Sequence, residues 1–192
     1  MSSSSELPAA VAYALHQWNS AEIRLAHLFQ VLSDMPDHQK AHDLFDGVIN
    51  LEIRLSLCSS LIEHENIDAL EKEMWNRLKN KIMSLYKKRH EIAHFTLISD
   101  GSGQVTHLAP FWSEGKFFKE KINYLSLDQV QERTAKFAEI RPAIGWFWVA
   151  ALKRRGQHET YPMPESPLIL RIREAAARNL EERAQRLPPS YS

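Results

Sequence analysis

The stretch KKRHEIAHF, residues 87–95, contains residue types at a spacing that could do chemistry. His90 and His94 flank Glu91 in an H-E-x-x-H pattern. On a helix this pattern places two imidazoles on one face for a zinc ion and supplies a glutamate as general base. The same residues spell R-x4-H from Arg89 to His94, the spacing of a metal-free ribonuclease motif. The rest of the chain has to decide between these interpretations.

Three long amphipathic segments are expected to position this stretch. Apolar residues recur at steps of three and four along residues 11–32, 41–62 and 70–92, which is typical of helices with one face toward a core. The short breaks at 33–37 and 63–66 predict that neighbouring helices run antiparallel. The R-x4-H stretch then lies at the end of the third helix.

The segment from 95 to 125 predicts a small β-meander directly after the motif. Asp100-Gly101-Ser102-Gly103 separates two short β-type runs, which indicates a hairpin, and a third strand is expected near Phe117-Phe118. A fourth helix is expected to start at Ser126 and to be interrupted by Pro142. A last, peripheral helix is expected to start at Ser166-Pro167.

These elements predict an all-α fold, an antiparallel bundle of four or five helices with a small β-meander inserted after the third long helix. The expected domains are residues 7–153 for the bundle, including the β-meander at 95–125, and residues 154–192 for a linker and the peripheral C-terminal helix.

The composition excludes a global electrostatic attraction to nucleic acid. Lys and Arg together number 24, as do Asp and Glu, so the formal net charge is zero, and any such binding needs a local patch. Cys58 lies in an apolar pattern and is expected to be a small buried side chain. The N-terminus lacks the features of a signal peptide, and no apolar run reaches membrane-spanning length. We therefore expect a cytoplasmic protein without membrane contact.

Several sequence features disfavour the zinc interpretation. Lys87, Lys88 and Arg89 precede the first histidine, and three cations raise the energy of a metal ion bound beside them. Residues 95–98 (FTLI) follow the motif, without the glycine and third histidine of an extended zinc motif. Glu132 and Glu139 are available downstream as acidic ligands, so a zinc hydrolase remains an alternative.

Arg89 is the residue that the helical pattern does not explain by packing. At about 100° per residue it shares one side of the third helix with Leu85 and Ile92, where an ionised guanidinium is costly unless it is paired or faces a cleft. One interpretation is a salt bridge to Glu52 or Asp46 in the second segment. That interpretation is compatible with a functional role, because an arginine held in place is preorganised.

This arrangement resembles the HEPN family (higher eukaryotes and prokaryotes nucleotide-binding), whose members are mostly small antiparallel helical bundles. The family motif consists of Arg, a polar residue, three further residues and His near the end of a late bundle helix, and residues 89–94 (RHEIAH) match it. A charged residue among aliphatics at 51–55 (LEIRL) is also similar to the family. The resemblance covers roughly residues 7–153.

The resemblance implies a homodimer whose paired motifs line one cleft and cleave RNA without a metal or other cofactor, leaving a 2′,3′-cyclic phosphate. His94 would act as general acid/base on the ribose 2′-hydroxyl, and Arg89 would stabilise negative charge on the scissile phosphate. His90 would orient the site or contact phosphate. Lys88 and Tyr86 are the candidate substrate-binding residues, with core packing as the alternative for Tyr86.

Three functional hypotheses follow. The first is a metal-independent endoribonuclease of a toxin–antitoxin or defence system, with an antitoxin protein as partner. The second is a non-catalytic module that dimerises and uses the same cleft to bind a nucleotide, RNA or a protein. The third is a zinc hydrolase.

Overall fold

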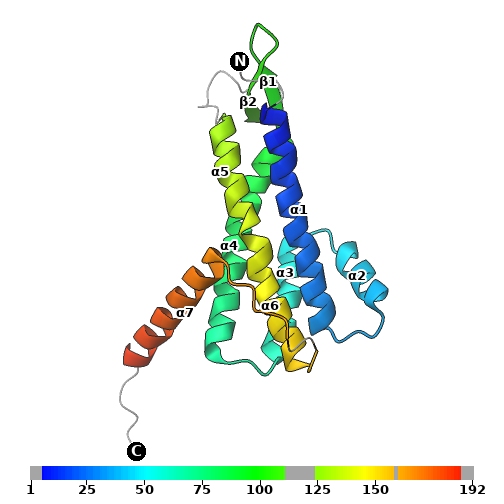
Figure 1. Ribbon diagram of the computed structural model, residues 1–192, viewed down its shortest axis with the longest axis vertical. Coiled ribbons are helices and arrows are strands. Elements are labelled where there is room, and N and C mark those ends of the chain that lie inside the picture. The colour runs from blue at the N-terminus through cyan, green and yellow to red at the C-terminus, as the bar shows by residue number, and fades with distance from the viewer. Residues whose placement is uncertain (1–5, 111–123, 158–159, 187–192) are drawn as a thin grey trace, which may run out of the picture. The chain divides into compact units, whose positions relative to one another are not determined.

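The computed structural model describes residues 6–110, 124–157 and 160–186, and it is mostly helical with one small antiparallel sheet. This confirms the prediction of an all-α fold with a small β insertion. None of the described helices is both long enough and apolar enough to cross a membrane. In chain order the elements are α1 (Glu6–Leu32), α2 (His38–Gly47), α3 (Leu51–His64), α4 (Ala69–His94), β1 (Phe95–Ser99), β2 (Val105–Pro110), α5 (Leu127–Ala138), α6 (Ile140–Arg154) and α7 (Pro167–Arg186) (Figure 1).

The chain forms two compact units. The first consists of Met1–Glu22 and Ser84–Ala138, and the second of Ile23–Met83 and Glu139–Ser192. α1 and α4 therefore each contribute residues to both units. α7 belongs to the second unit together with α6. The predicted domain boundary after residue 153 stays a prediction. The predicted bundle type stays a prediction.

The core of the first unit is built on aromatic side chains. Trp18 of α1 is 1% exposed and meets Phe137 of α5 edge-on, with 5.3 Å between the ring centroids. Leu85 and Ile92 of α4 are buried in the same unit, which confirms the apolar stripe predicted along that helix. Large buried rings contribute much of the hydrophobic stabilisation of a small unit. They therefore fix the C-terminal turns of α4, on which the motif lies.

The predicted hairpin is present directly after the motif (Figure 1). β1 and β2 pair antiparallel, with Leu97 opposite Leu108. In the turn, the Asp100 carboxylate accepts hydrogen bonds from the backbone N–H groups of Ser102 and Gln104, at 2.9 and 3.1 Å. Gly103 has a φ of 82°, a left-handed conformation that glycine adopts without steric cost. The third predicted strand, near residues 117–118, lies outside the described residues.

The prediction of one continuous helix over residues 41–62 is wrong. α2 ends at Gly47, and α3 begins at Leu51 after the extended residue Asn50. The Asn50 side chain accepts hydrogen bonds from the backbone N–H groups of Glu52 and Ile53, at 2.8 and 3.3 Å. This N-cap starts a new helix. The apolar spacing continues across the break and therefore does not reveal it.

The predicted interruption of the fourth helix is confirmed. Ser126 and Gln129 form a reciprocal capping box at the start of α5: the Ser126 N–H donates to Gln129 Oε1 at 2.9 Å, and the Gln129 N–H donates to Ser126 Oγ at 3.4 Å. The helix is interrupted at Glu139, and Pro142 lies in the first turn of α6. N–H groups in the first turn of a helix have no intrahelical acceptor, so the missing N–H group of proline costs no hydrogen bond there.

The second unit also follows the predicted caps and buried positions. Ser166 Oγ accepts a hydrogen bond from the Ile169 N–H at 3.2 Å, so α7 starts where the sequence indicates. Leu168 and Ile172 of α7 are buried, and Cys58 of α3 is a fully buried free thiol. Burial raises the pKa of Cys58 far above its ordinary value, which disfavours the thiolate. The burial itself confirms the prediction made from the apolar pattern around it.

Candidate active site at the end of α4

A column of aromatic rings leads from the core of the first unit to the surface at the motif. Tyr86, His90 and His94 are spaced by four residues along α4 and therefore share one side of the helix. Tyr86 stacks on Trp18 with 5.9 Å between ring centroids, His90 meets Tyr86 at 4.5 Å, and His94 stacks on His90 at 5.1 Å. Trp18 is buried, Tyr86 is half-buried, and both histidines are exposed. The column thus presents two supported imidazoles to solvent.

Tyr86 is placed to support the histidines. Its ring lies between Trp18 on one side and His90 on the other. Both neighbours occupy surfaces on which a nucleobase would otherwise stack, so the ring contact favours the packing alternative for Tyr86.

Arg89 has an unusual environment. It is half-buried, and its Nε atom is buried without a hydrogen-bond partner. Within the part of the chain that the structure describes, its guanidinium forms no ion pair. Asp46, one of its two predicted partners, instead lies 3.9 Å from the Arg54 guanidinium. A desolvated, unpartnered cation is costly, and an incoming anion would relieve that cost.

Arg133 of α5 holds the last turns of α4. Its NH1 atom lies 2.5 Å from Glu91 Oε2 and donates to the Lys88 carbonyl at 3.3 Å. A cation at the C-terminal end of a helix also interacts favourably with the helix dipole. Sequence reasoning missed Arg133. The one available signal is its place beside the buried residues Val130 and Thr134 in α5.

The charges around His90 favour its neutral form. Partial desolvation lowers the pKa of His90 below its ordinary value of 6.5, and the positive charge of Arg89 and then that of His94 lower it further. A neutral imidazole near neutral pH is able to accept a proton. Lys88 is half-buried at the same helix end. The hydrogen bond and charge of Lys136 lower the pKa of Glu132, and the charge of Lys88 lowers it further.

The contacts of the acidic residues give no support to a zinc site. Glu91, the general base in the zinc interpretation, pairs with Arg133. Of the two downstream acids, Glu132 pairs with Lys136, and Glu139 lies 2.8 Å from Arg171. Among residues 6–110, 124–157 and 160–186, no group of three His, Cys, Asp or Glu side chains is placed to hold a metal ion.

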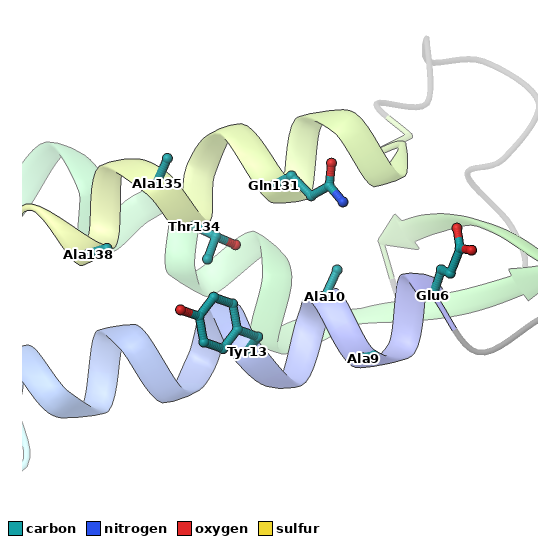
Figure 2. A pocket seen from close by; sticks show the side chains of 8 residues that line it. All are labelled: Glu6, Ala9, Ala10, Tyr13, Gln131, Thr134, Ala135 and Ala138. Carbon is teal, nitrogen blue, oxygen red and sulfur yellow. The ribbon is translucent and has the colours of Figure 1, made fainter. Parts of the chain in front are cut away.

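A separate open groove of about 600 Å³ lies in the first unit, between α1 and α5. Small side chains line much of it, and Figure 2 shows Tyr13 of α1 pointing toward Thr134 of α5. None of the R-x4-H residues lines it. The groove is therefore a different surface from the motif. Its small residues are Ala9, Ala10, Ala135 and Ala138.

Comparisons of the chain with protein-family models, with curated proteins and with solved structures found no match. Functional inference therefore rests on the residues and contacts of this chain.

Proposed function

We propose that the protein is a HEPN-type, metal-independent endoribonuclease that acts as a homodimer. The observation that supports this proposal is a half-buried Arg89 that pairs with no carboxylate of the described residues, followed on the same helix by His90 and His94, two exposed imidazoles that stack on each other. A guanidinium without a carboxylate is suited to a phosphate, and imidazoles are suited to proton transfer near neutral pH.

The reaction uses the ribose of the substrate as the nucleophile. His94 removes the proton from a 2′-hydroxyl, and the 2′-oxygen attacks the adjacent phosphorus while the bond to the 5′-oxygen breaks. The leaving 5′-oxygen takes up a proton from water, and His94 returns its own proton to the solvent, so the products carry a 2′,3′-cyclic phosphate and a 5′-hydroxyl. Arg89 stabilises the negative charge that develops on the phosphate oxygens, and His90 contacts phosphate or orients His94 through their stacked rings.

The proposal also includes a second copy of the chain and an antitoxin protein. In the homodimer, two motifs face one cleft, so that each phosphate meets more cationic groups than one chain offers. An antitoxin protein would act by covering His90 and His94, which are exposed in the single chain. Lys88 adds a further positive charge for the RNA backbone.

An RNA-cleavage assay with EDTA tests the proposed activity. We expect His94→Ala and Arg89→Ala each to lower the cleavage rate by about 10²–10⁴-fold, the range for loss of one acid–base group. His107→Ala is the matched control, because His107 is an exposed histidine of the same unit outside the motif. The wild-type products should carry cyclic phosphate ends. Equal cleavage by all four proteins, or loss of cleavage with EDTA, would overturn the proposal.

The second candidate is a non-catalytic module that dimerises or binds a protein. The observation that favours it is a set of exposed aliphatic side chains on and between α2 and α3: Leu44 is 59%, Ile49 93% and Ile53 51% exposed. Sedimentation equilibrium of the wild type and of Ile53→Glu tests this candidate. RNA binding without cleavage, together with a dimer that Ile53→Glu dissociates, would favour it over the nuclease.

A further inference from the structure

Two arginines, two histidines and one tryptophan form a group in the second unit. Ring contacts link Arg24, His27, His42 and Trp148, and the charge of Arg141 acts on Arg24 and His27. Arg24 and His27 come from α1, His42 comes from α2, and Arg141 and Trp148 come from α6. We call this group the arginine–histidine cluster. It is separate from the R-x4-H motif, which lies in the first unit.

Ring contacts join four members of the cluster, Arg24, His27, His42 and Trp148. The central guanidinium carbon of Arg24 lies 4.5 Å from the centroid of the Trp148 ring, which is a cation–π contact. The His27 ring lies 6.4 Å from Trp148 and 5.4 Å from His42, between centroids. Arg24, His27, His42 and Trp148 are half-buried, and Arg141 is exposed. The cluster is therefore ordered by an aromatic side chain and still reaches solvent.

The arginines of the cluster have no counter-ion among residues 6–110, 124–157 and 160–186. Within the described part of the chain, neither arginine forms an ion pair or a hydrogen bond through its guanidinium. Carboxylates close in sequence are engaged elsewhere: Glu22 accepts from Trp18, Glu139 lies 2.8 Å from Arg171, and Asp43 accepts from Gln39 at 2.8 Å. This contrasts with the usual pairing of half-buried arginines in proteins.

Burial and the neighbouring positive charges disfavour the protonated forms of Arg24 and His27. Burial, followed by the charge of Arg141, lowers the pKa of Arg24. Burial, followed by the charges of Arg24, His42 and Arg141, lowers the pKa of His27. All of the interacting charges have the same sign, so an anion placed among them would be attracted by every one.

From this geometry we infer that the arginine–histidine cluster is a binding site for a phosphate group, either the free ion or the phosphate of a nucleotide. Guanidinium groups hold phosphate oxygens through paired N–H donors, and the imidazole N–H groups supply further donors. Trp148 keeps the Arg24 guanidinium in place before the ligand arrives, which lowers the entropic cost of binding. This site does not depend on the proposed nuclease function, because no residue of the R-x4-H motif takes part.

Isothermal titration calorimetry on the full-length protein, at constant ionic strength, tests this inference. Inorganic phosphate, adenosine 5′-monophosphate and adenosine are titrated separately. We expect phosphate or the monophosphate to bind the wild type, and adenosine not to bind. Equal affinities for phosphate and the monophosphate indicate a free-phosphate site, whereas tighter monophosphate binding indicates a nucleotide site. Binding of adenosine as tight as that of the monophosphate would overturn the inference.

Substitutions locate the binding. Arg24→Gln with Arg141→Gln should weaken binding of the phosphate ligand by at least about tenfold, which corresponds to the loss of one charge-assisted contact. Arg141→Gln alone, at an exposed position, should weaken it in the same direction with an unchanged circular dichroism spectrum. Arg178→Gln removes one exposed charge from the same unit and should leave affinity unchanged. Unchanged affinity in Arg141→Gln, or an equal loss in Arg178→Gln, would overturn the inference.

Discussion

The C-terminal ends of α4 and α6 both carry arginines, but their surroundings differ. At the end of α6, Arg154 NH1 lies 2.8 Å from Glu71 Oε1, and Arg155 NH2 lies 2.5 Å from Glu65 Oε1. Glu65 also pairs with Arg154, at 3.2 Å. At the end of α4, the guanidinium of Arg89 pairs with no carboxylate of the described residues, and its Nε atom is buried without a partner.

The difference separates arginines whose charges are paired within the fold from an arginine that pairs with no carboxylate of the described residues. Arg154 and Arg155 connect the end of α6 to residues before and within α4, and their charges are compensated there. Arg133 has the corresponding role in the first unit through Glu91. Arg89 connects nothing among the described residues. Removing a paired arginine or its carboxylate should therefore cost stability, whereas removing Arg89 should cost function.

The largest expected effect on stability is at Glu65. Glu65→Ala leaves the half-buried Arg155 and the exposed Arg154 with fewer partners and should lower the free energy of unfolding by about 2 kcal/mol, the range for hydrogen bonds to charged groups. Arg89→Met keeps the apolar stem and removes an unpartnered polar group, so it should change that free energy by less than about 0.5 kcal/mol. Urea denaturation measures both. If Arg89→Met destabilised the protein as much as Glu65→Ala does, Arg89 would have a structural role like that of the arginines at the end of α6.

A smaller effect is expected at Arg133. Arg133→Ala removes the ion pair to Glu91 and the hydrogen bond to the Lys88 carbonyl, and it should lower the free energy of unfolding by about 1 kcal/mol. If the protein is the proposed ribonuclease, RNA cleavage should fall with it, because the end of α4 is then less well held. Lys136→Ala, on the same helix, breaks only the exposed pair with Glu132 and should have an effect below about 0.5 kcal/mol. If RNA cleavage falls in Arg133→Ala but not in Lys136→Ala, the loss comes from the contacts that Arg133 makes with the end of α4.

The smallest expected effect is a pH dependence. The pKa values of His27 and His90 are lowered in the folded protein from 6.5. The unfolded chain therefore binds protons more readily just below pH 6.5, and the free energy of unfolding should fall as the pH drops through the folded-state pKa values. Urea denaturation at about pH 7.5 and about pH 5.5 measures this loss. His27→Gln and His90→Gln should each lose less unfolding free energy between these two pH values than the wild type does. A larger loss in either variant would contradict a lowered pKa for the histidine that was replaced.

Local sequence signals were sufficient for several parts of the fold. Ser126 and Ser166 mark helix starts because an N-cap needs only a side-chain oxygen three residues before a free N–H group. The turn at Asp100 is equally local. The break between α2 and α3 was missed, although Gly47 and Asn50 are residue types that favour it, because the apolar spacing runs through them.

The sequence by itself determined which residues are neighbours along a helix. His90 and His94 share a face because they are four residues apart, and Arg89 lies on the apolar side of α4 by the same periodicity. Only the tertiary structure decided which of these groups have partners. Arg133 reaches Glu91 from another helix, and Arg24 meets Trp148 across more than a hundred residues of chain. The physical reason is that helical periodicity fixes the direction of each side chain, whereas compensation of its charge depends on which helices pack together.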